Sequence, residues 1–251
     1  MAVSEFAENY HKKMFPGYVS DFKRTDPEFI ERFDNFAFDE VINQPEAEID
    51  ERTRYLAILS VLMGSQAVDQ FRAIVGAAME FGLKPVEIKE VVYQAVAYLG
   101  MGRVLPFLKA VNEIFTEKGI ALPLEFQGTT EPDKESRQKA GTEAQVEIFG
   151  ESMKDFYNGG HINYWLADYC FGDWYTRRGL SLADRELITF CFLYAQGGCE
   201  NQMRGHAAGN FRVGNDAGFL KKVVSACVPF IGFPRSLNAI AIIDECSDKT
   251  E

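Results

Sequence analysis

The feature that most constrains the fold is an internal repeat. The segment 88–100 places apolar side chains at positions i, i+3, i+4, i+7, i+8 and i+11, and the same pattern returns at 220–232, with Leu220 in the place of Ile88. The same offset in residue number relates three further pairs: Gly82 and Gly214, Arg72 and Arg204, and Arg103 and Arg235. Upstream, the pairs Phe38 and Phe171, and Arg52 and Arg185, lie one position further apart, which indicates one inserted or lost residue. The chain is therefore a tandem duplication of a unit of roughly 110 to 130 residues.

The periodicity of the repeated unit is helical. Strand signals are scarce, and apolar residues make up 47% of the chain, which is enough for a packed core. We therefore predict an all-α fold. The expected helices in the first half are 5–14, 27–43, 53–63, 66–81, 85–99 and 104–118. A polar stretch at 126–142 is the best linker, so we expect one repeat in 1–125 and the other in 143–251.

Composition excludes several classes of partner. The formal net charge of −11 argues against binding to nucleic acid or to an anionic membrane surface. The N-terminal residues do not form a signal segment, and no apolar run reaches the length of a transmembrane helix. Five cysteines at irregular spacing do not indicate a disulfide framework. These features predict a reduced, cytoplasmic protein.

The segment 196–206 carries the most reactive combination of side chains. Cys199 follows a Gly-Gly break, and His206 lies at i+7 from it, on the same face of a helix beginning at Cys199. A thiol on the first turn of a helix is expected to have a lowered pKa. The alternative to a reactive pair is structural: His206 could be a buried, hydrogen-bonded histidine, and Cys199 could be a small side chain that only fills space in the core. The first repeat has Ala67 and Ile74 at these positions, so the scaffold does not require Cys or His there. A functional role for Cys199 and His206 is therefore favoured over a structural one.

No functional role is expected for the remaining cysteines and histidines. Cys191 and Cys227 fall within apolar helix patterns, and Cys170 lies in an aromatic-rich segment, so all three are expected to pack in the interior. His11 and His161 are expected at the surface. No phosphate-binding glycine loop and no cluster of His and Cys at metal-ligand spacing occurs.

Both repeats resemble the carboxymuconolactone decarboxylase family, which includes the alkylhydroperoxidase D proteins. The resemblance is carried by Phe171–Leu180, Asp184–Phe190, Cys199…His206 and Gly214 in the second repeat, and by Asp50–Arg54 and the segment from Gly82 to about Phe115 in the first. It covers almost the whole chain apart from the linker. It implies an all-helical fold, homo-oligomers and no cofactor. If the family oligomer has six units, three two-repeat chains could build it.

The resemblance also implies roles for particular residues. The hydroperoxidase branch uses a Cys-x-x-Cys-x-x-x-His motif and an upstream glutamate, to which Glu186 is the best match. Cys199 and His206 occupy the first-Cys and His positions, but Gln202 stands where the second Cys should be. The decarboxylase branch has a Glu…His pair without the dithiol, and Glu200…His206 resembles that pair better.

Two glutamates, Glu186 and Glu200, are thus candidates for the carboxylate that pairs with His206. Glu200 lies about 120° round the helix from His206 and could simply pair with Arg204 on the surface. Glu186 could be solvated, or could approach the Cys/His face if its helix forms an antiparallel hairpin with the next one. The sequence leaves this choice open.

The expected function is acid/base decarboxylation or isomerisation of a small carboxylated lactone or related acid, with His206 as the proton shuttle. One alternative is a single-cysteine peroxidase, in which Cys199 attacks the peroxide and an external thiol resolves the sulfenic acid. Another is a non-catalytic, oligomeric helical binding protein.

Overall fold

The structure is a computed structural model that describes residues 2–248. The first repeat contains α1 (Glu5–Met14), α2 (Phe22–Thr25), α3 (Pro27–Asn35), the π-helix η1 (Phe36–Glu40), the 3-10 helix η2 (Pro45–Ala47), α4 (Glu51–Gly64), α5 (Val68–Glu80), α6 (Pro85–Leu99) and α7 (Met101–Glu117). The second contains α8 (Lys134–Phe149), the 3-10 helices η3 (Glu151–Met153) and η4 (Phe156–Gly159), α9 (His161–Trp165), the π-helix η5 (Leu166–Tyr175), α10 (Leu182–Gln196), α11 (Glu200–Arg212), α12 (Ala217–Ile231) and α13 (Phe233–Ser247). Residues 2–248 contain no strand, and the all-α prediction is confirmed. None of these helices is both long and apolar enough to cross a bilayer.

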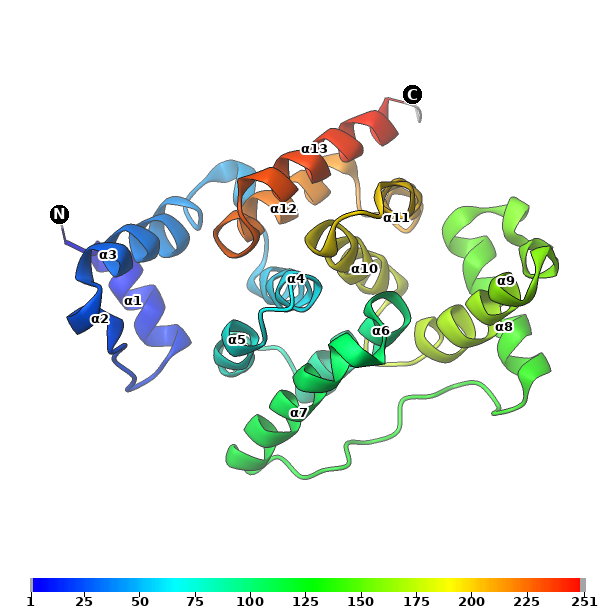
Figure 1. The fold of residues 1–251 in the computed structure, drawn as a ribbon, viewed down its shortest axis with the longest axis horizontal. Coiled ribbons are helices and arrows are strands. Elements are labelled where there is room, and N and C mark those ends of the chain that lie inside the picture. The colour runs from blue at the N-terminus through cyan, green and yellow to red at the C-terminus, as the bar shows by residue number, and fades with distance from the viewer. Residues whose placement is uncertain (1, 249–251) are drawn as a thin grey trace.

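The duplication is visible in the helix boundaries. Helices α5 and α6 begin and end at positions that the repeat offset maps onto the ends of α11 and α12, and the start of α7 maps onto the start of α13. The first helices of the two repeats, α1 to α3 and α8 to α9, lie at opposite ends of the molecule, with α4 and α10 between them (Figure 1). Helix α4 is apolar nearly all round and is buried from Thr53 to Gly64. Helices α4 and α10 pack so closely that a Cβ at Gly64 would lie 2.7 Å from the Cβ of Ala195.

The helix caps correct one pairing inferred from the sequence. Asp50 accepts a hydrogen bond from Thr53 N at the start of α4, and Ser181 caps α10 in the same way. Counting an equal distance from each cap makes Arg54 the counterpart of Arg185, and both arginines are buried. Arg52 instead crosses between the repeats and donates to Asp184 at 2.8 Å.

Two of the repeated arginines make structural ion pairs. Arg72 pairs with Glu113 at 2.6 Å, and Arg204 pairs with Glu245 at 2.8 Å. The repeat offset also relates the two glutamates, so the whole pair is repeated. Because all four side chains are well exposed, each pair contributes little to stability.

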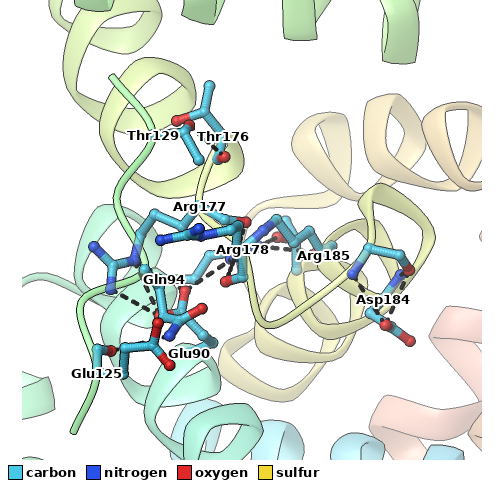
Figure 2. A network of polar contacts seen from close by, with 12 residues as sticks. Glu90, Gln94, Glu125, Thr129, Thr176, Arg177, Arg178, Asp184 and Arg185 are labelled. Carbon is cyan, nitrogen blue, oxygen red and sulfur yellow. Dashed lines mark hydrogen bonds and ion pairs between the residues drawn. The ribbon is translucent and has the colours of Figure 1, made fainter. Parts of the chain in front are cut away.

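A buried ionic cluster joins the repeats (Figure 2). Glu90 of α6 is 1% exposed and accepts from Arg177 at 2.8 Å and from Arg185 at 3.0 Å. Gln94, one turn further along α6, accepts from Arg185 Nη1 at 2.8 Å and donates to its backbone carbonyl at 2.9 Å. A charge this deeply buried requires its partners, so the cluster holds α6 of the first repeat against α10 of the second.

The connection between repeats is shorter than the polar composition suggested. Residues 120–133 contain no helix, but α8 begins at Lys134, inside the stretch 126–142. Asp133 starts this helix by accepting from Ser136 N at 2.9 Å. The connection is held against the second repeat, because Arg178 donates to the carbonyls of Phe126 and Gln127.

Candidate active site

A cavity of about 780 Å³ lies where α8, η5, α10 and α11 of the second repeat meet α6 of the first. Most of its wall is apolar. The polar or reactive groups that line it are Tyr98, Gln145, Cys170, Gln196, Cys199, Gln202, His206 and Arg212. Residues of the stretch 196–206 therefore line a cavity, and Cys199 and His206 are among them.

The centre of the site is a pair between His206 and Glu186. His206 Nδ1 lies 2.9 Å from Glu186 Oε2; Glu186 is 0% exposed and His206 is 8% exposed. Helices α10 and α11 form a hairpin because Gly197 and Gly198 turn the chain with φ of 70° and 73°, a conformation that favours glycine. The hairpin brings Glu186, near the start of α10, against His206 on α11. Glu200 is exposed on the first turn of α11, and no hydrogen bond or ion pair joins it to His206 in the part of the chain that the structure describes, so the partner is Glu186.

Two small or polar residues on α11 make room for this pair. A Cβ at position 209 would lie 2.6 Å from Glu186 Oε2, so Gly209 allows the carboxylate to sit against the helix. Asn210 Nδ2 donates to the backbone carbonyls of Glu186 at 2.9 Å and of His206 at 2.7 Å. The first repeat has Ala77 and Ala78 at these positions. Gly209 and Asn210 are thus specific to the repeat that carries the pair.

A chain of buried hydroxyl groups supports Glu186 from the other side. Tyr175 donates to Glu186 Oε1 at 2.8 Å. Its oxygen is 2.8 Å from the hydroxyl of Tyr98 and 2.9 Å from that of Thr189. Because Tyr175 uses its one O–H in the hydrogen bond to Glu186, the hydroxyls of Tyr98 and Thr189 must both donate to the Tyr175 oxygen. Burial raises the pKa of Tyr98 and of Tyr175 well above the usual value, so both remain protonated donors at neutral pH.

The hydroxyl chain connects the site to the ionic cluster between the repeats. Gln94 Nε2 donates to Thr189 Oγ1 at 2.8 Å and also contacts Arg185, which pairs with Glu90. The carboxylate of Glu186 therefore has hydrogen-bond partners on both oxygens, and its surroundings are fixed by side chains from both repeats. Such support holds the imidazole in one orientation.

The prediction of a lowered pKa for Cys199 is wrong. Helix α11 begins at Glu200, so Cys199 is the residue before its first turn. Its thiol points back and donates to the carbonyl of Leu193 at 3.3 Å, and does not face the free N–H groups of α11. Burial raises the pKa of Cys199; a hydrogen bond from Gln196 opposes this, and the charge of Glu200 adds to it.

The other predicted cysteines and histidines are placed as follows. Cys170, Cys191 and Cys227 are buried, as expected, and burial raises the pKa of Cys170 to about 12 although it lines the cavity. His161 is exposed, as expected. His11 is half-buried and lines a second cavity in the first repeat, so it is less exposed than expected. No group of three or more His, Cys, Asp or Glu side chains within residues 2–248 is arranged to hold a metal ion.

Two further residues of the cavity were missed by the sequence reasoning. Gln145 is 0% exposed, and neither Oε1 nor Nε2 has a hydrogen-bond partner among the described residues. An unpaired buried amide is costly, so a bound molecule with a complementary polar group would relieve that cost. Arg212 is exposed at the cavity and makes no ion pair with any described residue, which makes it the cation available to an anionic ligand.

Comparison with known proteins identifies the family of the chain. The model of the carboxymuconolactone decarboxylase family matches residues 27–113 and 162–245, one segment in each repeat. A 4-carboxymuconolactone decarboxylase from Acinetobacter baylyi is 29% identical over 119 residues, which is 44% of this chain and 87% of that protein. The two matched segments cover more than half of the chain and coincide with the two structural repeats. The chain belongs to the carboxymuconolactone decarboxylase family.

Proposed function

We propose that the second repeat catalyses acid/base decarboxylation or isomerisation of a small carboxylated lactone or related acid. The observation that carries this proposal is the buried pair of Glu186 and His206 on the cavity wall. With Nδ1 held by Glu186, Nε2 is the ring nitrogen available to a substrate. A carboxylate on Nδ1 fixes the tautomer of the imidazole and stabilises the imidazolium that forms during proton transfer.

In the decarboxylation, the bond between the ring carbon and the carboxylate breaks, and CO₂ leaves. The electron pair passes into an enolate delocalised onto the lactone carbonyl. The protonated imidazole of His206 then transfers a proton from Nε2 to carbon, and solvent restores that proton, so one proton is consumed for each CO₂ released. In the isomerisation, neutral His206 removes a proton from one carbon and returns it to another.

The cavity fits a small anion with an apolar body. Arg212 supplies a positive charge for a carboxylate, and the amide of Gln145 can donate to a lactone carbonyl. The wall around these groups is mostly apolar, which strengthens their interactions with the developing charge. Similarity to a 4-carboxymuconolactone decarboxylase supports the same substrate class.

The test is a panel of carboxylated lactones and organic peroxides, assayed with the wild type and with His206→Gln. We expect turnover of at least one lactone, with release of CO₂ or a shifted double bond, and a loss of about 10²- to 10⁴-fold in the variant. Full turnover of every accepted lactone by His206→Gln would refute the proposal.

A thiol peroxidase remains a second candidate, because Cys199 lines the same cavity as His206. Its mechanism would need the Cys199 thiolate, which the raised pKa disfavours. Cys199→Ser should therefore keep its turnover of lactones. Peroxide turnover that exceeds lactone turnover and disappears in Cys199→Ser would establish the peroxidase instead, and no turnover of either class would favour the non-catalytic binding protein.

A further inference from the structure

The first repeat contains a cavity of its own. It has a volume of about 590 Å³ and lies among α1, α2, α3, η1 and α5. It is the counterpart of the cavity around His206, because lining residues of one recur in the lining of the other. Phe15 corresponds to Phe149, Phe38 to Phe171, and Gln70 to Gln202, at the repeat offset or within two positions of it. The duplication has thus preserved a cavity in both repeats.

The chemistry of the two cavities differs. Counting from the helix caps, Tyr55 corresponds to Glu186, and Ile74 corresponds to His206 by the repeat offset, so the first cavity lacks the acid/base pair. It has instead His11 at the place of Gln145. Burial, followed by the charge of Lys23, lowers the pKa of His11, which is therefore neutral at pH 7.

The distinctive polar group of the first cavity is Asp34. It is 3% exposed, and its carboxyl makes no hydrogen bond or ion pair with any residue that the structure describes. Burial raises the pKa of Asp34, and the charge of Lys23 opposes this from beyond ion-pair distance. A buried carboxylate without a partner is unfavourable, and a cation bound beside it would restore the missing interaction.

The rest of the lining also favours a cation. Asp69 adds a second carboxylate, and the one arginine of the lining, Arg72, is paired with Glu113 at 2.6 Å. Aromatic rings, including those of Phe15 and Phe33, form much of the wall. Aromatic faces attract organic cations and pack against flat rings.

We propose that this cavity, with Asp34 as its anionic anchor, binds a small organic amine with an aromatic or alicyclic ring and does not turn it over. The site is independent of the chemistry at His206. The ammonium group would pair with Asp34, and the ring would pack among the phenylalanines. The lost pair of catalytic residues explains why the first cavity would be a binding site alone.

The test is isothermal titration of the full chain with three probes of one shape: benzylamine, benzyl alcohol and benzoate. We expect benzylamine to bind at least ten-fold more tightly than either of the others. Asp34→Asn, which is nearly isosteric, should weaken benzylamine at least ten-fold and leave benzyl alcohol unchanged. Thermal unfolding of each variant checks that it is folded.

A matched pair of substitutions locates the site. Ala73 and Gly205 occupy the same position in the two repeats, both are exposed, and each lines its own cavity. Ala73→Phe should block benzylamine binding, whereas Gly205→Phe should leave it intact. The proposal is overturned by equal binding of benzyl alcohol or benzoate, by unchanged affinity in Asp34→Asn, by loss of binding in Gly205→Phe alone, or by the absence of benzylamine binding.

Discussion

Replacement of Glu186 by glutamine tests the centre of the site with the smallest change of shape. In the wild type, Glu186 Oε2 accepts a hydrogen bond from His206 Nδ1 at 2.9 Å, and Oε1 accepts one from Tyr175 at 2.8 Å. In Glu186→Gln the carbonyl oxygen still accepts from Tyr175, but the NH₂ group now faces Nδ1 and can only donate to it. The ring proton then moves to Nε2, so neutral His206 can no longer act as a base toward the cavity. The imidazolium that would protonate carbon also loses the carboxylate that stabilises it.

The expected effect is large on activity and small on stability. General acid/base catalysis contributes about 10²- to 10⁴-fold in rate, which corresponds to about 2.7 to 5.4 kcal/mol in activation free energy. No buried atom loses its hydrogen-bond partner in this variant. The free energy of unfolding should therefore change by less than about 2 kcal/mol.

The assay is the steady-state kcat for an accepted lactone, together with urea unfolding of each variant. Glu200→Gln is the matched control, because Glu200 also lies close to the site in the sequence but is exposed and does not contact His206. It should keep kcat within about two-fold of the wild type. A large loss of kcat in Glu200→Gln, with little loss in Glu186→Gln, would refute the assignment of the pair.

Three further predictions concern packing, stability and assembly. Gly209→Ala places a methyl group 2.6 Å from Glu186 Oε2. We expect at least a ten-fold loss of kcat, and overpacking should lower the unfolding free energy by about 1 to 3 kcal/mol. In the control Gly205→Ala the methyl group meets no atom within 4 Å, and urea unfolding should show a gain of up to about 1 kcal/mol. Glu90→Gln leaves the buried Arg185 and the partly buried Arg177 without their shared carboxylate and should lower the unfolding free energy by about 3 to 5 kcal/mol. Glu28→Gln, at an exposed pair with Arg32, should cost less than about 1 kcal/mol. Exposed apolar side chains recur at the same positions of α7 and α13, as Met101 and Phe233 and as Leu105 and Leu237, and we expect them to pack between chains. Light scattering should therefore give the mass of three chains, and Leu237→Glu should reduce this mass. A monomeric wild type would contradict this prediction.

The helices could be predicted from the sequence because their signals are local. Pro27, Gly82 and the apolar spacing of 88–99 each act within one or two turns, and the resulting helices are confirmed to within a few residues. The repeat offset then fixed which helices correspond. The register at Arg185 was misjudged because it was matched to Arg52 by residue type, whereas the caps at Asp50 and Ser181 align it with Arg54.

The site was predictable in its residues but less so in its contacts. His206 stood out because the first repeat has isoleucine at that position. The choice between Glu186 and Glu200 depends on how α10 and α11 pack, and no local pattern decides it. The pKa of Cys199 depends on the direction of its thiol and on burial, which one-dimensional spacing does not report. Gly209 and Asn210 did carry a signal, since they replace Ala77 and Ala78 of the first repeat.

The least predictable contribution to the site comes from the other repeat. Tyr98 of α6 donates to Tyr175 behind Glu186, and its ring lies 5.4 Å from that of His206. The equivalent residue of α12, Phe230, lies 6.5 Å from Phe33 of the first repeat. Each repeat thus contributes an aromatic side chain to the other. Glu90 of the first repeat holds the two together by pairing with Arg185, the residue before Glu186. Holding Tyr98 and Gln94 against the second repeat needs no acid/base pair in the first. That role requires the hydrophobic skeleton of the helices and does not require Cys or His.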